Sequence, residues 1–139
     1  MSKFQITYDA IQHATALQQD KGRSLALDSC TATGGKGEEL SPGELVGAAV
    51  AGCMLFSMGV VALRDELDLT GTTVDIDVAL GQERIESIDL GFTFPPNLAV
   101  RDGAKLERAA ASCPIKRSFL PEVTISSRFT WPEPAGTGS

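Results

Sequence analysis

The stretch from Leu45 to Leu63 contains no charged residue, and it constrains the fold more than any other part of the chain. By length alone such a run could cross a lipid bilayer. Glycines and alanines dilute it, however, and it lacks the flanking lysines and aromatic belt that are typical of membrane spans. We therefore expect a long central helix that is buried on all sides by its own domain or by a partner.

The start of this helix is predicted by the sequence Ser-Pro-Gly-Glu at 41–44. Ser41 suits the N-cap, Pro42 suits the first helical position, and Glu44 stands at the third position of a capping box. We expect the helix to end near Glu66, shortly before Gly71.

Alternation of apolar and polar residues predicts strands on both sides of this helix. A first strand begins at Phe4 and can continue to Thr15, and a return strand follows a turn at 18–22. The remaining expected elements are strands at 74–80, 88–94 and 123–131, a second helix at 102–112, and one further helical turn after Pro114. The order β-β-α-β-β-α-β with short connections predicts an α+β fold with a largely antiparallel sheet.

Length and charge limit the possible organisation and partners. A chain of 139 residues fits one domain, which we place at 1–131, followed by a flexible tail at 132–139. The net charge of −6 argues against binding nucleic acid or an anionic membrane surface. No signal peptide is recognisable, and three cysteines do not form a paired disulfide framework. We therefore expect a cytoplasmic protein.

A helix that is apolar all round needs more cover than five strands and one short helix can give. A homodimer in which two such helices pack on each other would supply it. The small residues Gly47, Ala48, Ala51 and Gly52 would permit that close approach.

Two cysteines are candidates for chemistry. Cys53 lies in the uncharged run, on one helical face with Phe56, Ser57 and Val60. It is either an inert core residue or a reactive thiol. An apolar environment raises a thiol pKa, so we expect a reactive Cys53 to need a cation from another segment.

Cys113 directly precedes Pro114, which suits the start of a helical turn. Cys113 can therefore be the N-cap of that turn, where free backbone N–H groups favour a thiolate. It is otherwise a plain cysteine at a helix end. If it faces Cys53 across a pocket, the pair suits thiol–disulfide chemistry. Cys30 has no such support, and we regard it as structural.

The chain resembles the OsmC/Ohr family of organic hydroperoxide reductases, and in particular an OsmC-like subgroup. The resemblance rests on Gly-Gly-Lys-Gly at 34–37, Ser-Pro-Gly-Glu-Leu at 41–45, the small-residue helix that leads to Gly52-Cys53, and Ser-Cys-Pro-Ile at 112–115. Their order and spacing agree over roughly residues 20 to 130. The Gly-Cys helix together with the distant Cys-Pro pair is the specific part of this match.

The resemblance implies an intertwined homodimer with two long central helices and with active sites at the subunit interface. It implies that Cys53 attacks an organic or lipid hydroperoxide and that Cys113 resolves the resulting sulfenic acid as a disulfide. It implies no cofactor, and it implies reduction by a dithiol such as a lipoylated protein.

The chain departs from the family at two activating residues. In the hydroperoxide reductases a glutamate follows the helix-start proline and acts with an arginine. Here Gly43 takes that place, and Glu44, one position later, points off the far side of the helix. Arg23 is our candidate for the cation, with Glu38 or Glu39 to orient it.

These departures keep two other hypotheses open. One is an OsmC-like stress or small-ligand-binding protein with little peroxidase activity, and another is a dithiol redox sensor. A zinc site formed by Cys53, Cys113 and His13 has suitable ligand types, but the spacing follows no zinc motif.

Overall fold

The computed structural model describes residues 3–132, so most of the predicted tail, from 133 onward, lies outside the described residues. The elements are β1 (Gln5–Ala10), β2 (His13–Gln18), β3 (Arg23–Asp28), α1 (Pro42–Arg64), β4 (Thr73–Leu80), β5 (Ile85–Thr93), α2 (Gly103–Ala111), α3 (Pro114–Arg117) and β6 (Thr124–Thr130). The chain divides into two compact units between Val46 and Gly47, and each is described by itself. A single domain at 1–131 stays a prediction.

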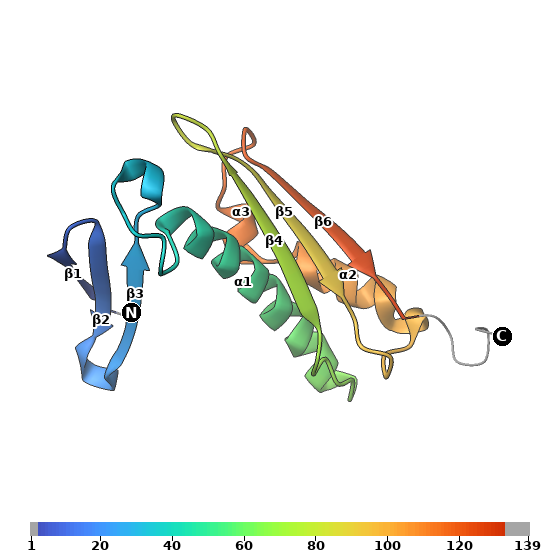
Figure 1. Cartoon of the computed structure of the whole chain (residues 1–139). Helices are drawn as coiled ribbons and strands as arrows, with labels where there is room; N and C mark the ends of the chain where they lie inside the picture. Colours follow the sequence, from blue (N-terminus) through green and yellow to red (C-terminus); the bar gives the residue numbers. More distant parts are fainter. Residues whose placement is uncertain (1–2, 133–139) are drawn as a thin grey trace. The chain divides into compact units, whose positions relative to one another are not determined.

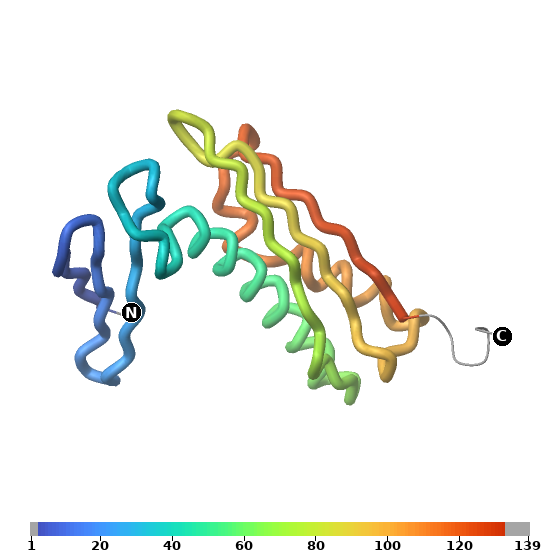
Figure 2. Tube along the Cα trace, in the orientation of Figure 1, coloured from blue at the N-terminus to red at the C-terminus, as the bar shows by residue number. Residues whose placement is uncertain are grey.

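The first unit is an antiparallel sheet in the order β1-β2-β3 (Figure 2). Our prediction of one strand running from Phe4 to Thr15 is wrong, because the chain reverses at Ile11 and Gln12. Gln12 adopts a positive φ of 56° there. Its backbone N–H donates to the Tyr8 hydroxyl at 2.9 Å, which stabilises the turn without a glycine.

The second unit contains a sheet in the order β4-β5-β6 (Figure 1). β4 pairs antiparallel with β5, whereas β5 pairs parallel with β6. Parallel neighbours need a crossover connection, and here that crossover carries α2 and α3. The α+β class and the largely antiparallel pairing are confirmed, although the fold has one more strand than the order we predicted.

The core of the second unit lies between this sheet and one side of α1. Val50, Met54 and Met58 of the helix are buried, as are Leu90 and Phe92 of β5. At Gly47 the helix comes so close to β4 that an added Cβ would lie 2.6 Å from Val78 Cγ2 and 2.9 Å from Ile76 Cγ2. Glycine therefore sets the distance between helix and sheet at this point.

The other side of α1 is exposed. Phe56, Val60 and Leu63 have 79%, 69% and 84% of their surface accessible, so a single chain does not bury the helix on all sides, and burial by a partner stays a prediction. Gly47 packs on β4 within the second unit, and Ala51 is buried there. By length and by its mean hydropathy of 2.2 this helix could cross a membrane, but core helices share those properties.

Both ends of α1 follow local rules. At its start the Ser41 N–H donates to Glu44 Oε1 at 3.0 Å and the Glu44 N–H donates to Ser41 Oγ at 3.2 Å, which confirms the predicted capping box. The helix ends at Arg64, two residues before the expected position, because Glu66 takes a positive φ of 57°. The Leu67 N–H then closes the end on the Ala62 carbonyl at 2.8 Å.

Polar and aromatic contacts fix α2 in the second unit. Lys105 Nζ lies 2.7 Å from Asp65 Oδ2 and 3.3 Å from Asp102 Oδ1, which ties the helix to the end of α1. The Trp131 ring stacks on Phe94 with 3.8 Å between centroids. Gly103 leaves room for the indole, because an added Cβ would lie 3.0 Å from it. These contacts hold the helix that leads into Cys113.

Candidate active site

Cys113 lies fully buried where α2 gives way to α3. Its backbone leaves the helical conformation before Pro114, and its Sγ accepts a hydrogen bond from the Lys116 N–H at 3.3 Å. This confirms that Cys113 caps the turn that begins at Pro114. Burial raises the pKa of the Cys113 thiol and the neighbouring Cys53 raises it further, while the Lys116 N–H acts in the opposite direction.

Cys53 is half-buried on α1, beside the exposed stripe that includes Phe56 and Val60. A hydrogen bond from the Cys113 thiol is the largest influence on it and lowers the Cys53 pKa. The backbone N–H of Ile115 and the hydroxyl of Ser57 lower it as well, against the opposing effect of burial. The structure therefore brings the two predicted cysteines together.

The direction of the Cys53 shift differs from our expectation. We expected the apolar helix to raise the pKa of this thiol unless another segment brought a cation. The groups of the second unit that lower it are instead neutral hydrogen-bond donors. Hydrogen bonds to the charged form of an acid favour that form, and this outweighs the cost of partial burial.

The two thiols consequently have different chemical characters. Cys53 has the lowered pKa and is the more accessible, so it is the thiol of the pair that ionises more readily and that a reagent meets first. Cys113 has the raised pKa and is buried. A thiolate with a protonated thiol beside it can act as a nucleophile that a second sulfur later captures.

Arg23 lies in the first unit, at the start of β3. Its Nε donates to Gln18 Oε1 at 2.8 Å, and its Nη2 donates to the same oxygen. Gln18 is buried, with 2% of its surface accessible. The role of Arg23 as the activating cation stays a prediction. Glu44 is already committed to the helix cap.

Cys30 is an exposed thiol of the first unit. A hydrogen bond with the Thr33 side chain, at 3.4 Å from the sulfur, lowers its pKa together with nearby backbone N–H groups. Cys30 is the N-cap residue of the short 3-10 helix Thr31–Thr33, but its side chain makes no hydrogen bond to that helix as a cap.

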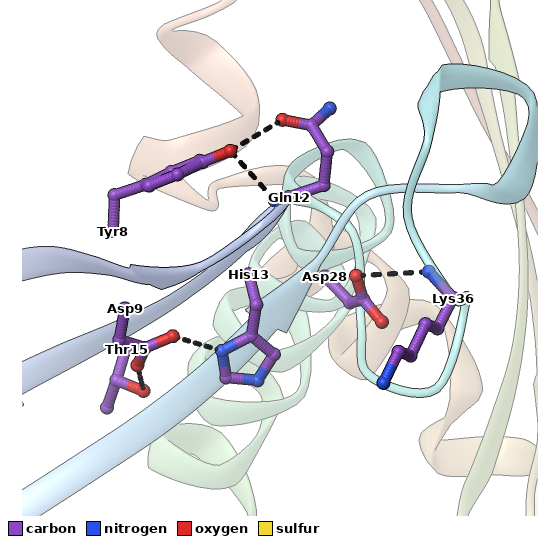
Figure 3. A network of polar contacts seen from close by, with 7 residues as sticks. All are labelled: Tyr8, Asp9, Gln12, His13, Thr15, Asp28 and Lys36. Atoms are coloured by element: carbon purple, nitrogen blue, oxygen red, sulfur yellow. Dashed lines mark hydrogen bonds and ion pairs between the residues drawn. The ribbon is translucent and has the colours of Figure 1, made fainter.

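His13 belongs to a polar network of the first unit (Figure 3). Its Nδ1 pairs with Asp9, whose other oxygen accepts a hydrogen bond from the Thr15 hydroxyl at 2.6 Å. The buried Asp28 accepts backbone N–H groups of Lys36 and Glu38 at 3.4 and 3.2 Å. Within residues 3–132 no three His, Cys, Asp or Glu side chains gather as a metal site would require.

Sequence reasoning missed two groups at the site. Ser57 was placed on the face of Cys53 by its i+4 spacing, but its contact with the sulfur was not predicted. The Ile115 N–H is brought to Cys53 only by the crossover between β5 and β6. The free N–H groups of the turn after Cys113 were the available signal for it.

Solved structures show the same fold. A protein of Psychrobacter arcticus assigned to osmotic stress and detoxification responses superimposes with a TM-score of 0.86 at 24% identity, over 93% of this chain and 96% of that one. An OsmC-like protein of Mycoplasma pneumoniae gives 0.76 at 12% identity, over 96% and 98%. The organic hydroperoxide resistance protein OhrB of Bacillus subtilis gives 0.67 at 16% identity, over 94% and 98%.

Comparison with curated proteins gives no significant match. The sequence profile of the family described as OsmC-like protein matches residues 35–128, which include α1, both site cysteines and most of β6. The chain therefore belongs to the OsmC-like family.

Proposed function

We propose that this protein is a cysteine-based peroxidase that reduces organic hydroperoxides in the cytoplasm as part of a stress response. The observation that supports this most directly is the contact between Cys53 and Cys113, with a lowered pKa on the accessible sulfur and a raised pKa on the buried one. Hydroperoxide-resistance proteins among the structural neighbours support the same role.

In the proposed reaction the Cys53 thiolate attacks the terminal oxygen of the hydroperoxide. The O–O bond breaks, the alkoxide leaves and takes a proton to become the alcohol, and Cys53 is oxidised to a sulfenic acid. The Cys113 thiol then condenses with this sulfenic acid, forming the disulfide and releasing water. An external dithiol, such as the dihydrolipoyl group of a carrier protein, reduces the disulfide, returns both thiols and is itself oxidised to the lipoyl disulfide.

The exposed apolar surface beside Cys53 supports an organic substrate. Phe56 and Val60 form an apolar surface next to the sulfur, and neither is covered within the chain. An alkyl or acyl chain gains from removing such surface from water, whereas hydrogen peroxide does not.

The same surface supports the proposed homodimer. Ala49, Phe56, Val60 and Leu63 form an exposed stripe along α1. In the first unit Phe4, Ile6 and Tyr8 of the β1 region are also exposed. Monomeric proteins seldom leave contiguous apolar patches of this kind uncovered. A dimer that covers the α1 stripe would bring its interface next to Cys53, and Arg23 stays our candidate for the activating cation.

Consumption of cumene hydroperoxide with dihydrolipoamide as reductant tests the proposal. We expect turnover by the wild type, none by Cys53→Ser, and, with the reductant left out, a single equivalent consumed by Cys113→Ser, because its sulfenic acid has no second thiol to resolve it. A wild-type protein that consumes no hydroperoxide under these conditions contradicts the proposal.

One observation favours a second candidate, a small-ligand-binding protein of the same family. Gly43 offers no carboxylate, and Glu44 is engaged with Ser41, so neither supplies an acidic group to the thiolate. If the wild type is inactive but the exposed apolar surface on α1 binds a hydrophobic dye in competition with fatty acids, this second function is supported.

A further inference from the structure

A buried carboxylate of the first unit holds the loop that leads to α1. Asp28 ends β3 with 5% of its surface accessible, and its two oxygens accept the backbone N–H groups of Lys36 and Glu38 at 3.4 and 3.2 Å. Its own backbone N–H donates to the Leu40 carbonyl at 3.2 Å. Because Leu40 directly precedes the Ser41 cap, one aspartate fixes the end of the loop from three points.

His13 stands beside this carboxylate on the neighbouring strand (Figure 3). β2 and β3 pair antiparallel with His13 directly opposite Asp28. Residues opposite each other in such a ladder project from the same face, with Cβ atoms about 4.5–5.5 Å apart. On the side of β1, His13 Nδ1 pairs with Asp9. The histidine thus lies between a carboxylate of β1 and the carboxylate that holds the loop.

The charged groups that face His13 are negative. Asp9, Asp28 and Glu39 act on it from β1, β3 and the loop, and each favours the charged imidazolium. Lys36 gives its backbone N–H to Asp28, and its ammonium forms no ion pair among residues 3–132. A protonated His13 therefore places positive charge among three carboxylates from three segments, whereas a neutral His13 leaves their repulsion uncompensated.

We propose that His13 is a pH-sensitive switch whose protonated form keeps the loop at 29–40 closed on the end of β3 and whose neutral form lets the segment at 36–40 open. The switch belongs to the first unit and is independent of the proposed peroxidase chemistry. Histidine suits this role because its ordinary pKa lies near neutrality. The loop is therefore held below the raised pKa of His13 and released as the pH rises through that value.

The carboxylate on the loop side does not titrate in the same range. Burial acts to raise the pKa of Asp28, but the N–H groups of Glu38 and Lys36 outweigh it, so this pKa is lowered. Asp28 stays ionised and keeps its hydrogen bonds when His13 loses its proton. We therefore expect the loop to open more often, without unfolding of the β1-β2-β3 sheet.

Amide hydrogen exchange of the full chain, followed by NMR from about pH 5.5 to 8.5, tests the switch. The probes are the N–H groups of Lys36 and Glu38, with protection expressed relative to the intrinsic exchange rate at each pH. The Leu67 N–H, bonded to the Ala62 carbonyl at 2.8 Å in the second unit, is the reference. His13→Lys and His13→Gln form a matched pair, because lysine is charged and glutamine neutral throughout this range.

We expect the protection of the Lys36 and Glu38 amides to fall by roughly three- to tenfold as the pH rises through the His13 midpoint, the effect of one screened charge pair near the surface. His13→Lys should keep the high protection at every pH, and His13→Gln should show the low protection at every pH. The Leu67 reference should not change.

Asp9→Asn gives a second measurement if a variant at His13 does not fold. It should lower the His13 midpoint, and by linkage the exchange transition of the loop should move down by the same amount. Equal protection in His13→Lys and His13→Gln, or a loop transition that does not follow the His13 midpoint, would overturn the inference. None of these measurements needs a hydroperoxide, so their result is separate from that of the peroxidase assay.

Discussion

The close approach of α1 to β4 at Gly47 leads to a quantitative prediction. A Cβ added at Gly47 would lie 2.6 Å from Val78 Cγ2 and 2.9 Å from Ile76 Cγ2. Carbon atoms prefer separations of about 3.5–4.0 Å, so both methyl groups would have to move by roughly 1 Å. Both belong to β-branched side chains of a paired strand and have little freedom to do so.

Two effects then oppose each other in Gly47→Ala. Overpacking of a well-packed core costs about 1–3 kcal/mol. Replacing glycine by alanine inside a helix contributes about 1 kcal/mol in the stabilising direction. Gly59→Ala is the matched control, because it lies in the same helix and a Cβ there meets nothing within 4 Å. We expect it to show the helix gain alone.

Urea unfolding monitored by circular dichroism, at one protein concentration, measures the difference between these variants. Gly47→Ala should be less stable than Gly59→Ala by about 1–3 kcal/mol, which is the packing cost free of the propensity effect. Equal stabilisation by both substitutions would refute the argument that helix and sheet are in contact at Gly47.

Three further predictions follow from charges and exposed surface. His13, the only histidine, should titrate above its ordinary pKa of 6.5 because it pairs with Asp9. The stability from this pair is complete below pH 6.5 and is lost as the pH rises through the raised pKa. Asp9→Asn should lower the midpoint of the His13 titration measured by NMR. Arg64 and Lys105 lower the pKa of Asp65 to about 2. The contribution of Asp65 to folding stability is therefore present above pH 3.8 and lost as the pH falls through about 2. Lys105→Met should raise the pKa of Asp65 in a carboxyl NMR titration, and an unchanged value would contradict the pairing. Phe56→Glu should convert the proposed dimer to monomer in analytical ultracentrifugation, whereas an unchanged mass would show that α1 is not the interface.

Local signals in the sequence predicted the parts of the fold that depend on local chemistry. The capping box at Ser41 and Glu44 needs only the residues that form it, and the structure has both hydrogen bonds. The cap at Cys113 is a similar case, because Pro114 imposes the start of a turn and the sulfur is the nearest acceptor.

Features that depend on distant segments were not predictable in this way. The reversal at Gln12 has no glycine or asparagine to announce it, and its positive φ is supported by Tyr8 and by a hydrogen bond to the Thr33 carbonyl. The lowered pKa of Cys53 depends on the Cys113 thiol and the Ile115 N–H. Both lie at the turn that begins after α2, and the helical periodicity of α1 does not reveal them. Arg23 was singled out because a thiolate needs charge compensation, and the sequence does not specify where its guanidinium goes.

The parallel pairing of β5 with β6 makes the position of Cys113 sensitive to residues that never touch a sulfur. Cys113 arrives on a connection whose two ends are anchored in neighbouring strands, with Ile88 opposite Ile125 and Phe92 opposite Phe129. A slip of one position along β6 would turn its apolar side chains to the opposite face and drag the connection with it. A substitution in that strand that shifts its register therefore moves Cys113 relative to Cys53 while leaving each thiol chemically intact.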